Sequence, residues 1–231
     1  FTLQNGILIT VDPEGTQLIN IPEKIWLASL FIGLAAIVDF LDGFVARFFK
    51  ASSEMGKQLD SLADVVSFGV APAMIVYQFL RLSYAQQEDG LDINMGYLLP
   101  AFILPCAAAY RLGRFNLDTT QQFGFKGLPV PAAGLLIASF PLIYWFSGST
   151  ALVGLFLNKW LWYGTILLLS GLMVSTLPLM AFKFKDYTVA NNWPKYLVVL
   201  IAVIGGILLQ WLAIPLVIIS YVVLSLALKQ A

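Results

Sequence analysis

Residues 39–64 read DFLDGFVARFFKASSEMGKQLDSLAD. Any fold of this chain must accommodate the four aspartates of this stretch, which lie in otherwise apolar surroundings. Asp39 and Asp42 are three residues apart, so they share one face of a helix. Asp60 and Asp64, four residues apart, share a face in the same way. Each acid inside a membrane costs about 2.5 to 3.5 kcal/mol on insertion scales, so four of them require a compensating partner.

The composition of the whole chain indicates a membrane protein. Of its 231 residues, 59% are hydrophobic and 11% are charged, whereas about 25% are charged in an ordinary soluble domain. The mean hydropathy is +0.84, which leaves too little polar surface to cover a globule in water. These values exclude a soluble enzyme and a disordered chain.

Spanning helices need about 20 mostly apolar residues. Six segments approach or exceed that length: 25–49, 59–82, 95–115, 128–146, 160–182 and 196–228. The last is long enough for a hairpin of two short helices, broken near Gln210 and Pro215. Residues 1–11 make half a span, which we expect to be the tail of a shortened first helix. The predicted fold is all-α, a polytopic membrane bundle of about eight spans in one domain, 1–231.

Basic residues are distributed unevenly over the loops of this eight-span arrangement. One side receives only Lys24, Arg81 and Lys159. The other side receives ten: Arg47, Lys50, Lys57, Arg111, Arg114, Lys126, Lys183, Lys185, Lys195 and Lys229. Because basic loops stay inside, this asymmetry predicts that both termini and the aspartates lie on the cytoplasmic side.

The four aspartates are predicted to meet at one depth. Counting about 1.5 Å per residue from Arg47 and from Lys57 places both pairs some 5 to 12 Å into their helices. The sequence contains no histidine, which excludes Ser-His-Asp catalysis and imidazole metal sites. A cluster of carboxylates alone suits Mg²⁺ or Mn²⁺, with Ca²⁺ as an alternative occupant.

Two alternative roles for these acids stay open. They could form structural ion pairs with nearby basic residues: Arg47, Lys57, Arg111 or Arg114. They could also form the relay of a cation or proton transporter, since intramembrane acids often mark ion pathways. Gly43 and Gly56 lie beside the acids; they would let a bulky group approach the backbone, or would serve only helix packing.

The same stretch resembles the CDP-alcohol phosphotransferase family. It fits the pattern D-x-x-D-G-x-x-A-R-(x)8-G-x-x-x-D-x-x-x-D without a mismatch. The resemblance implies that Asp39 and Asp60 bridge two divalent ions, that Asp42 and Asp64 complete their coordination, and that Asp64 is the general base. It also implies that a second group of residues lines the pocket for the cytidine diphosphate part of the substrate: Gly43, Ala46, Arg47, Ser53 and Gly56. Thr2 and Asn5 are further candidates for the wall of this pocket.

A narrower resemblance concerns the acceptor. DSLADVVSFGVAPA at 60–73, RLGRFN at 111–116 and FKGLPVPAAG at 125–134 look like bacterial and archaeal CDP-diacylglycerol:serine O-phosphatidyltransferases. Arg111 and Arg114 share a helix face and could hold the serine carboxylate or the pyrophosphate. Lys126 is a weaker candidate for the same role. Interfacial placement of both arginines beside lipid headgroups is the alternative.

These patterns give one hypothesis of function. An integral membrane enzyme would transfer the phosphatidyl group of CDP-diacylglycerol to L-serine, in a prokaryotic cytoplasmic membrane and as a homodimer. Residues 25–83 would form the catalytic helix pair, 95–134 the acceptor or phosphate region, and 160–228 the carboxy-terminal spans. Another acceptor, such as glycerol phosphate or inositol phosphate, is the alternative within the family.

Overall fold

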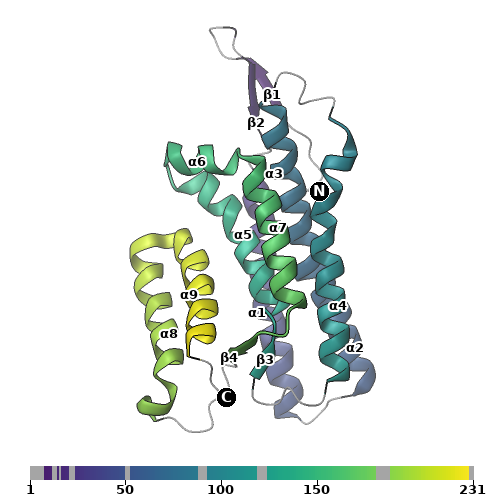
Figure 1. Cartoon of the computed structure of the whole chain (residues 1–231), viewed down its shortest axis with the longest axis vertical. Helices are drawn as coiled ribbons and strands as arrows, with labels where there is room; N and C mark the ends of the chain where they lie inside the picture. The colour runs from purple at the N-terminus through teal and green to yellow at the C-terminus, as the bar shows by residue number, and fades with distance from the viewer. Residues whose placement is uncertain are drawn as a thin grey trace.

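The structure, a computed structural model, describes residues 8–11, 15, 17–20, 24–49, 53–87, 93–118, 124–180 and 188–228. Within these ranges the chain is a bundle of helices along one long axis (Figure 1). The helices are α1 (Ile25–Phe48), α2 (Glu54–Asp64), α3 (Ala71–Ala85), α4 (Ile103–Leu117), α5 (Val130–Phe146), α6 (Thr150–Phe156), α7 (Lys159–Val174), α8 (Val189–Leu209) and α9 (Ala213–Ala227). A π-helical segment, η1 (Val65–Val70), and three 3-10 segments, η3 (Met95–Tyr97), η4 (Leu99–Phe102) and η5 (Gln210–Leu212), complete them.

Residues 8–11, the described part of the predicted first helix, form a strand of a hairpin and not a helix, whereas residues 1–7 lie outside the described residues. Strand β1 (Leu8–Val11) pairs antiparallel with β2 (Gln17–Asn20). The sequence of β1, Leu-Ile-Thr-Val, is rich in β-branched residues, which favour strands over helices. The second small sheet joins β3 (Gly124–Lys126) to β4 (Pro178–Met180) at the opposite end of the bundle.

Fewer than eight segments of the described residues have the length and hydropathy expected of a membrane span. Three helical segments are long and apolar enough to cross a membrane: Ile25–Val45, Glu54–Ala85 and Asn192–Ala227. The pair α6 and α7, bent by 67°, would make a fourth. Eight spans are not confirmed, because α4 has 15 residues and α5 has 17, fewer than the ~20 that a bilayer requires. The predicted span 95–115 begins with two 3-10 turns, and 160–182 ends in strand β4.

The predicted carboxy-terminal hairpin is confirmed. Helices α8 and α9 pack side by side (Figure 1). The turn between them is η5, which starts at Gln210 with a φ of 50°. Pro215 lies inside the first turn of α9, where its missing amide breaks no helical hydrogen bond.

The core of the bundle is an aromatic cluster that joins α3, α5, α6 and α7. Phe79 stacks on Trp162, with ring centroids 4.6 Å apart, and both side chains are fully buried. The indole Nε1 of Trp162 donates to the carbonyl of Phe156 at 2.8 Å, so its polar atom is satisfied. This cluster fixes the half of the bundle that lies away from the aspartates.

Near the aspartates, the bundle depends on a close backbone approach. Helix α2 continues without a break through η1 into α3. A Cβ atom on Gly134 of α5 would lie 2.9 Å from the Cα, the Cβ and the carbonyl oxygen of Phe68 in η1. Only glycine therefore lets α5 pack directly against the turn that follows Asp64.

We expect Gly134→Ala to destabilise the protein by about 1 to 3 kcal/mol, because its methyl group would overlap the backbone of η1. Thermal unfolding in detergent measures this change. The matched control is Gly171→Ala in α7, where a Cβ meets nothing within 4 Å and helix propensity improves by ~1 kcal/mol. An unchanged midpoint for Gly134→Ala would contradict this packing.

Candidate active site

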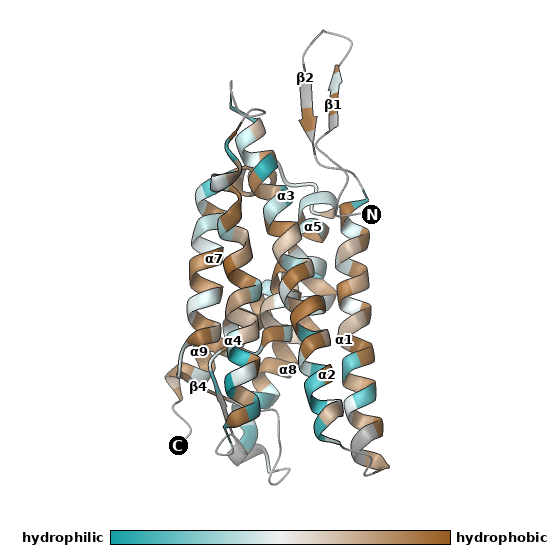
Figure 2. Ribbon diagram, turned by 90° about the vertical axis from the view of Figure 1, so that its right-hand side faces the viewer, coloured by the Kyte–Doolittle hydropathy of each residue, from teal (hydrophilic) through white to brown (hydrophobic). Residues whose placement is uncertain are grey.

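Three of the four aspartates converge between α1 and α2. Asp39, Asp42 and Asp60 each offer a carboxylate oxygen, and these atoms all lie within 4.8 Å of one another. Asp39 is half-buried, whereas Asp42 and Asp60 are exposed. Figure 2 shows hydrophilic residues in the lower parts of α1 and α2, whereas the upper part of α1 is mostly apolar. The prediction that acids from both helices meet at one depth is thus confirmed for these three.

The cluster lies between helices that are not themselves a packing pair. In the described residues α1 packs mainly on α5, while α2 contacts α4 and η1. Helix α2 contains no buried residue. Like charges this close repel one another, so neither apolar packing nor Coulomb energy holds the two acid-bearing faces together.

The structure does not support structural ion pairs as the role of the acids. Lys57 pairs with Glu54 at 2.7 Å, and Lys126 with Asp118 at 2.7 Å. No Lys or Arg whose side chain the structure describes forms an ion pair with any of the four aspartates. The side chain of Arg47, one of the predicted partners, lies outside that set. Three oxygen donors with uncompensated charge fit a hard divalent cation such as Mg²⁺ or Mn²⁺.

Asp64 has a different environment from the other three acids. It lies one turn after Asp60 at the end of α2, is half-buried, and is not in the group within 4.8 Å. It interacts electrostatically with Asp39 and Asp60 and also with Arg111 of α4. Asp64 therefore lies within electrostatic range both of the acid cluster and of the guanidinium on the neighbouring helix.

Arg111 is a buried basic residue on α4. Its side chain is buried, with 5% of its surface exposed, and packs over the ring of Phe115 at 5.9 Å. Within the described part of the chain, its Nε has no hydrogen-bond partner. A buried guanidinium N–H without a partner is costly, so an anionic group arriving beside Asp64 would satisfy it.

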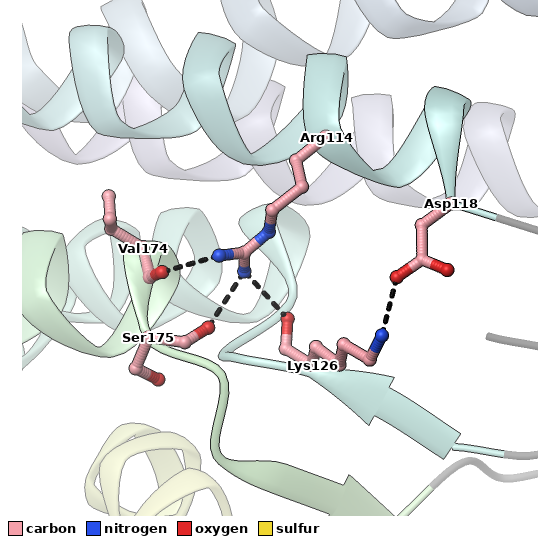
Figure 3. Close-up of polar contacts among 5 residues, drawn as sticks. All are labelled: Arg114, Asp118, Lys126, Val174 and Ser175. Atoms are coloured by element: carbon pink, nitrogen blue, oxygen red, sulfur yellow. Dashed lines mark hydrogen bonds and ion pairs between the residues drawn. The ribbon is translucent and has the colours of Figure 1, made fainter. Parts of the chain in front are cut away.

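Arg114 and Lys126 are occupied by structural contacts, unlike Arg111 (Figure 3). Nη1 of Arg114 donates to the carbonyl of Val174 at 2.7 Å. Its Nη2 donates to the carbonyls of Ser175 at 2.7 Å and Lys126 at 3.3 Å. Arg114 therefore caps the carboxyl end of α7, and the Lys126 ammonium bonds Asp118. Their predicted contact with substrate has no support in this geometry.

The loop before α5 is shaped by the same contacts. Gly127 has a φ of 78°, and a Cβ there would lie 2.7 Å from the carbonyl oxygens of Met173 and Ser175. Its amide donates to the carbonyl of Leu177 at 2.9 Å. The glycine and proline pattern at 125–134 is thus explained by conformation.

The proposed nucleotide-pocket residues are only partly described. A Cβ on Gly43 would meet no described atom within 4 Å, so the described residues leave space beside Asp42. Ser53 is the N-cap of α2: its Oγ accepts from the amide of Gly56 at 2.9 Å. Two predicted pocket residues, Thr2 and Asn5, lie outside the described residues, as do the side chains of Ala46 and Arg47.

One contact near the acids was missed by the sequence analysis. The Nδ2 of Asn116, in the last turn of α4, donates to the Oγ of Ser61 at 2.9 Å. Ser61 directly follows Asp60. A signal was present, because an amide beside apolar residues in a membrane helix usually has a partner on another helix, but nothing identified that partner.

We expect Arg114→Ala to destabilise the protein by about 2 to 3 kcal/mol even without substrate, because several carbonyls lose a charged donor. Thermal unfolding of the substrate-free protein measures this. Lys57→Ala, which removes only an exposed pair on α2, should change stability by less than ~0.5 kcal/mol. Unchanged stability of Arg114→Ala, with weaker substrate binding, would return Arg114 to the substrate site.

Comparison with known proteins agrees with this site. A CDP-diacylglycerol–serine O-phosphatidyltransferase of Bacillus subtilis is 36% identical over 123 residues, covering 51% of this chain and 61% of the relative. One of Helicobacter pylori is 33% identical over 163 residues, covering 68% and 62%. An archaetidylserine synthase of Methanothermobacter thermautotrophicus is 35% identical over 138 residues, covering 58% and 54%. The matches thus span less than two thirds of these relatives.

The sequence profile of one family matches residues 2–156, which include all four aspartates, Arg111 and the loop before α5. That match covers more than half of the chain and contains the convergent acids. The chain belongs to the CDP-alcohol phosphatidyltransferase family.

Proposed function

We propose that this protein transfers the phosphatidyl group of CDP-diacylglycerol to the hydroxyl of L-serine, releasing CMP and forming phosphatidylserine. The observation that carries the proposal is the convergence of Asp39, Asp42 and Asp60 from two helices, with Asp64 and buried Arg111 beside them. The names of the relatives, which include serine phosphatidyltransferases and an archaetidylserine synthase, support serine as the acceptor.

The residues present fit two divalent cations. Asp39, Asp42 and Asp60 would hold them, with Asp64 contributing at the edge of the cluster. When bound, such ions neutralise the charge that develops on the transferring phosphate and on the leaving CMP. Mg²⁺ or Mn²⁺ suits these oxygen ligands.

The protein's own groups perform the remaining work. Asp64 accepts the proton of the serine hydroxyl while the oxygen of that hydroxyl forms a bond to the lipid-side phosphorus. The bond from that phosphorus to the oxygen of CMP breaks, and CMP leaves. Arg111 pairs with an anionic group of a substrate, either the serine carboxylate or a phosphate, and orients it beside Asp64. The open space at Gly43 admits the nucleotide.

Orientation in the membrane is part of the same proposal. By their positions in the helices, Lys24 (just before α1), Arg81 (late in α3) and Lys159 (first in α7) lie toward one end of the bundle. Lys57 (early in α2), Arg114 (late in α4) and Lys126 (in β3) lie toward the other end (Figure 1). The second end, which carries the acids, would face the cytoplasm. Residues 25–83 would then be the catalytic helix pair and 95–134 the region that binds acceptor or phosphate, in a homodimer.

Purified protein given CDP-diacylglycerol, Mn²⁺ and labelled serine should form labelled phosphatidylserine and CMP. Asp39→Asn and Asp60→Asn should lose both Mn²⁺ binding and at least about 100-fold in rate, whereas Asp64→Asn should lose the rate and keep CDP-diacylglycerol binding. Glu54→Gln is the matched control, because Glu54 lies on the same helix but is exposed and outside the cluster. Transfer to glycerol phosphate or inositol phosphate but not serine would refute the acceptor.

Arg111→Lys separates the two possible partners of the guanidinium. Loss of bidentate binding should raise the KM for one substrate by about tenfold, which corresponds to one hydrogen bond to a charged group. A higher KM for serine assigns Arg111 to the serine carboxylate, and a higher KM for CDP-diacylglycerol assigns it to phosphate. Unchanged values for both would contradict any role in binding.

A further inference from the structure

Helix α2 carries Asp60 and Asp64 but has little of its own to hold it in place. It has 11 residues, none of them buried. Within the described residues, its amino-terminal end is capped by Ser53, a local contact within the same turn. Its carboxyl end runs into η1, which is firmly packed against Gly134 of α5. Helix α2 is therefore held mainly at its carboxyl end, where it continues into the packed segment η1.

The direction of the Asp60 and Asp64 carboxylates depends on how α2 is rotated about its own axis. Side chains reach about 5 to 6 Å from a helix axis, so a rotation of about 20° moves a carboxylate by about 2 Å. Metal–oxygen distances tolerate a few tenths of an ångström. A small rotation of α2 would thus separate Asp60 from Asp39 and Asp42, which come from the other helix.

One contact is placed to prevent that rotation. The hydrogen bond from Nδ2 of Asn116 to Oγ of Ser61, 2.9 Å long, is the side-chain hydrogen bond that joins α2 to another helix within the described ranges. The hydroxyl of Ser61 donates in turn to the carbonyl of Lys57 at 3.1 Å, which holds its rotamer. Ser61 lies between Asp60 and Asp64 in the chain, so this contact acts where rotation matters.

We propose that Asn116 is a positioning residue, which fixes the rotation of α2 through Ser61 and so directs Asp60 and Asp64 toward the acids of α1. The proposal deepens the proposed function by adding a support from α4 to the same site. It assigns Asn116 no contact with substrate or with metal.

The first test measures geometry alone. Spin labels at Val38→Cys on α1 and Leu62→Cys on α2, both exposed positions, are introduced with the one cysteine of the sequence replaced, Cys106→Ser. Double electron–electron resonance should give one narrow distribution of the distance between the two labels, and Asn116→Ala should broaden it. Asn94→Ala is the matched control, because it also removes one side-chain hydrogen bond, to the amide of Gly96 at the far end of the bundle. A broad parent distribution, or an equal width in Asn116→Ala, overturns the proposal.

The second test measures Mn²⁺ binding by the resonance signal of the free ion, without any substrate. Asn116→Ala and Ser61→Ala should each weaken binding by about two- to tenfold, the value of one hydrogen bond. The double variant should be no weaker than either single one, because both remove the same contact. Ser61→Thr, which keeps the hydroxyl, should bind as the parent does.

Additive losses in the double variant, or unchanged affinity in Asn116→Ala, would overturn the positioning role. Neither test uses serine or CDP-diacylglycerol. If the parent protein fails to make phosphatidylserine while both tests give the expected result, the proposed function fails and the role of Asn116 stands.

Discussion

The structure depends on an electrostatic constraint: three carboxylates from two helices lie within 4.8 Å of one another, although those helices do not pack together. Of the basic side chains that the structure describes, Lys57 pairs with Glu54 and Arg114 with backbone carbonyls, and neither pairs with these three acids. The rest of the bundle supplies the rigidity. An aromatic cluster around Trp162 fixes one half, and the close approach of Gly134 to Phe68 fixes the base of α2.

The two arginines of α4, Arg111 and Arg114, have different surroundings, although they lie only three residues apart. Arg111 is buried beside Asp64 with an Nε that lacks a partner within the described residues, whereas Arg114, one turn later, caps α7. Arg114 also bonds the carbonyl of Lys126, next to Gly127. This arrangement ties the end of α4 to the loop before α5, and so holds the helix from which Arg111 and Asn116 reach toward the acids.

Much of this site could be predicted from the sequence because its pattern is local. Helical spacing alone paired the acids, and the positions of α1 and of the α8–α9 hairpin followed from apolar length and from Gln210. The amino-terminal hairpin was not predicted, and α4 begins at Ile103 instead of Met95, because β-pairing and helix ends depend on tertiary contacts. The structural contacts of Arg114, Lys126 and Ser53 were not predicted for the same reason: their partners are mostly carbonyls and amides, which carry no sequence signal. Asn116 was visible in the sequence, but its partner Ser61, 55 residues away, was not.

Divalent cations between α1 and α2 would balance the charge of the acid cluster. An anomalous difference map of crystals grown with Mn²⁺ should then contain two peaks, both within coordination distance of Asp39 and Asp60. A well-ordered site without a peak, with the carboxylates of α1 and α2 turned away from each other, would contradict this expectation.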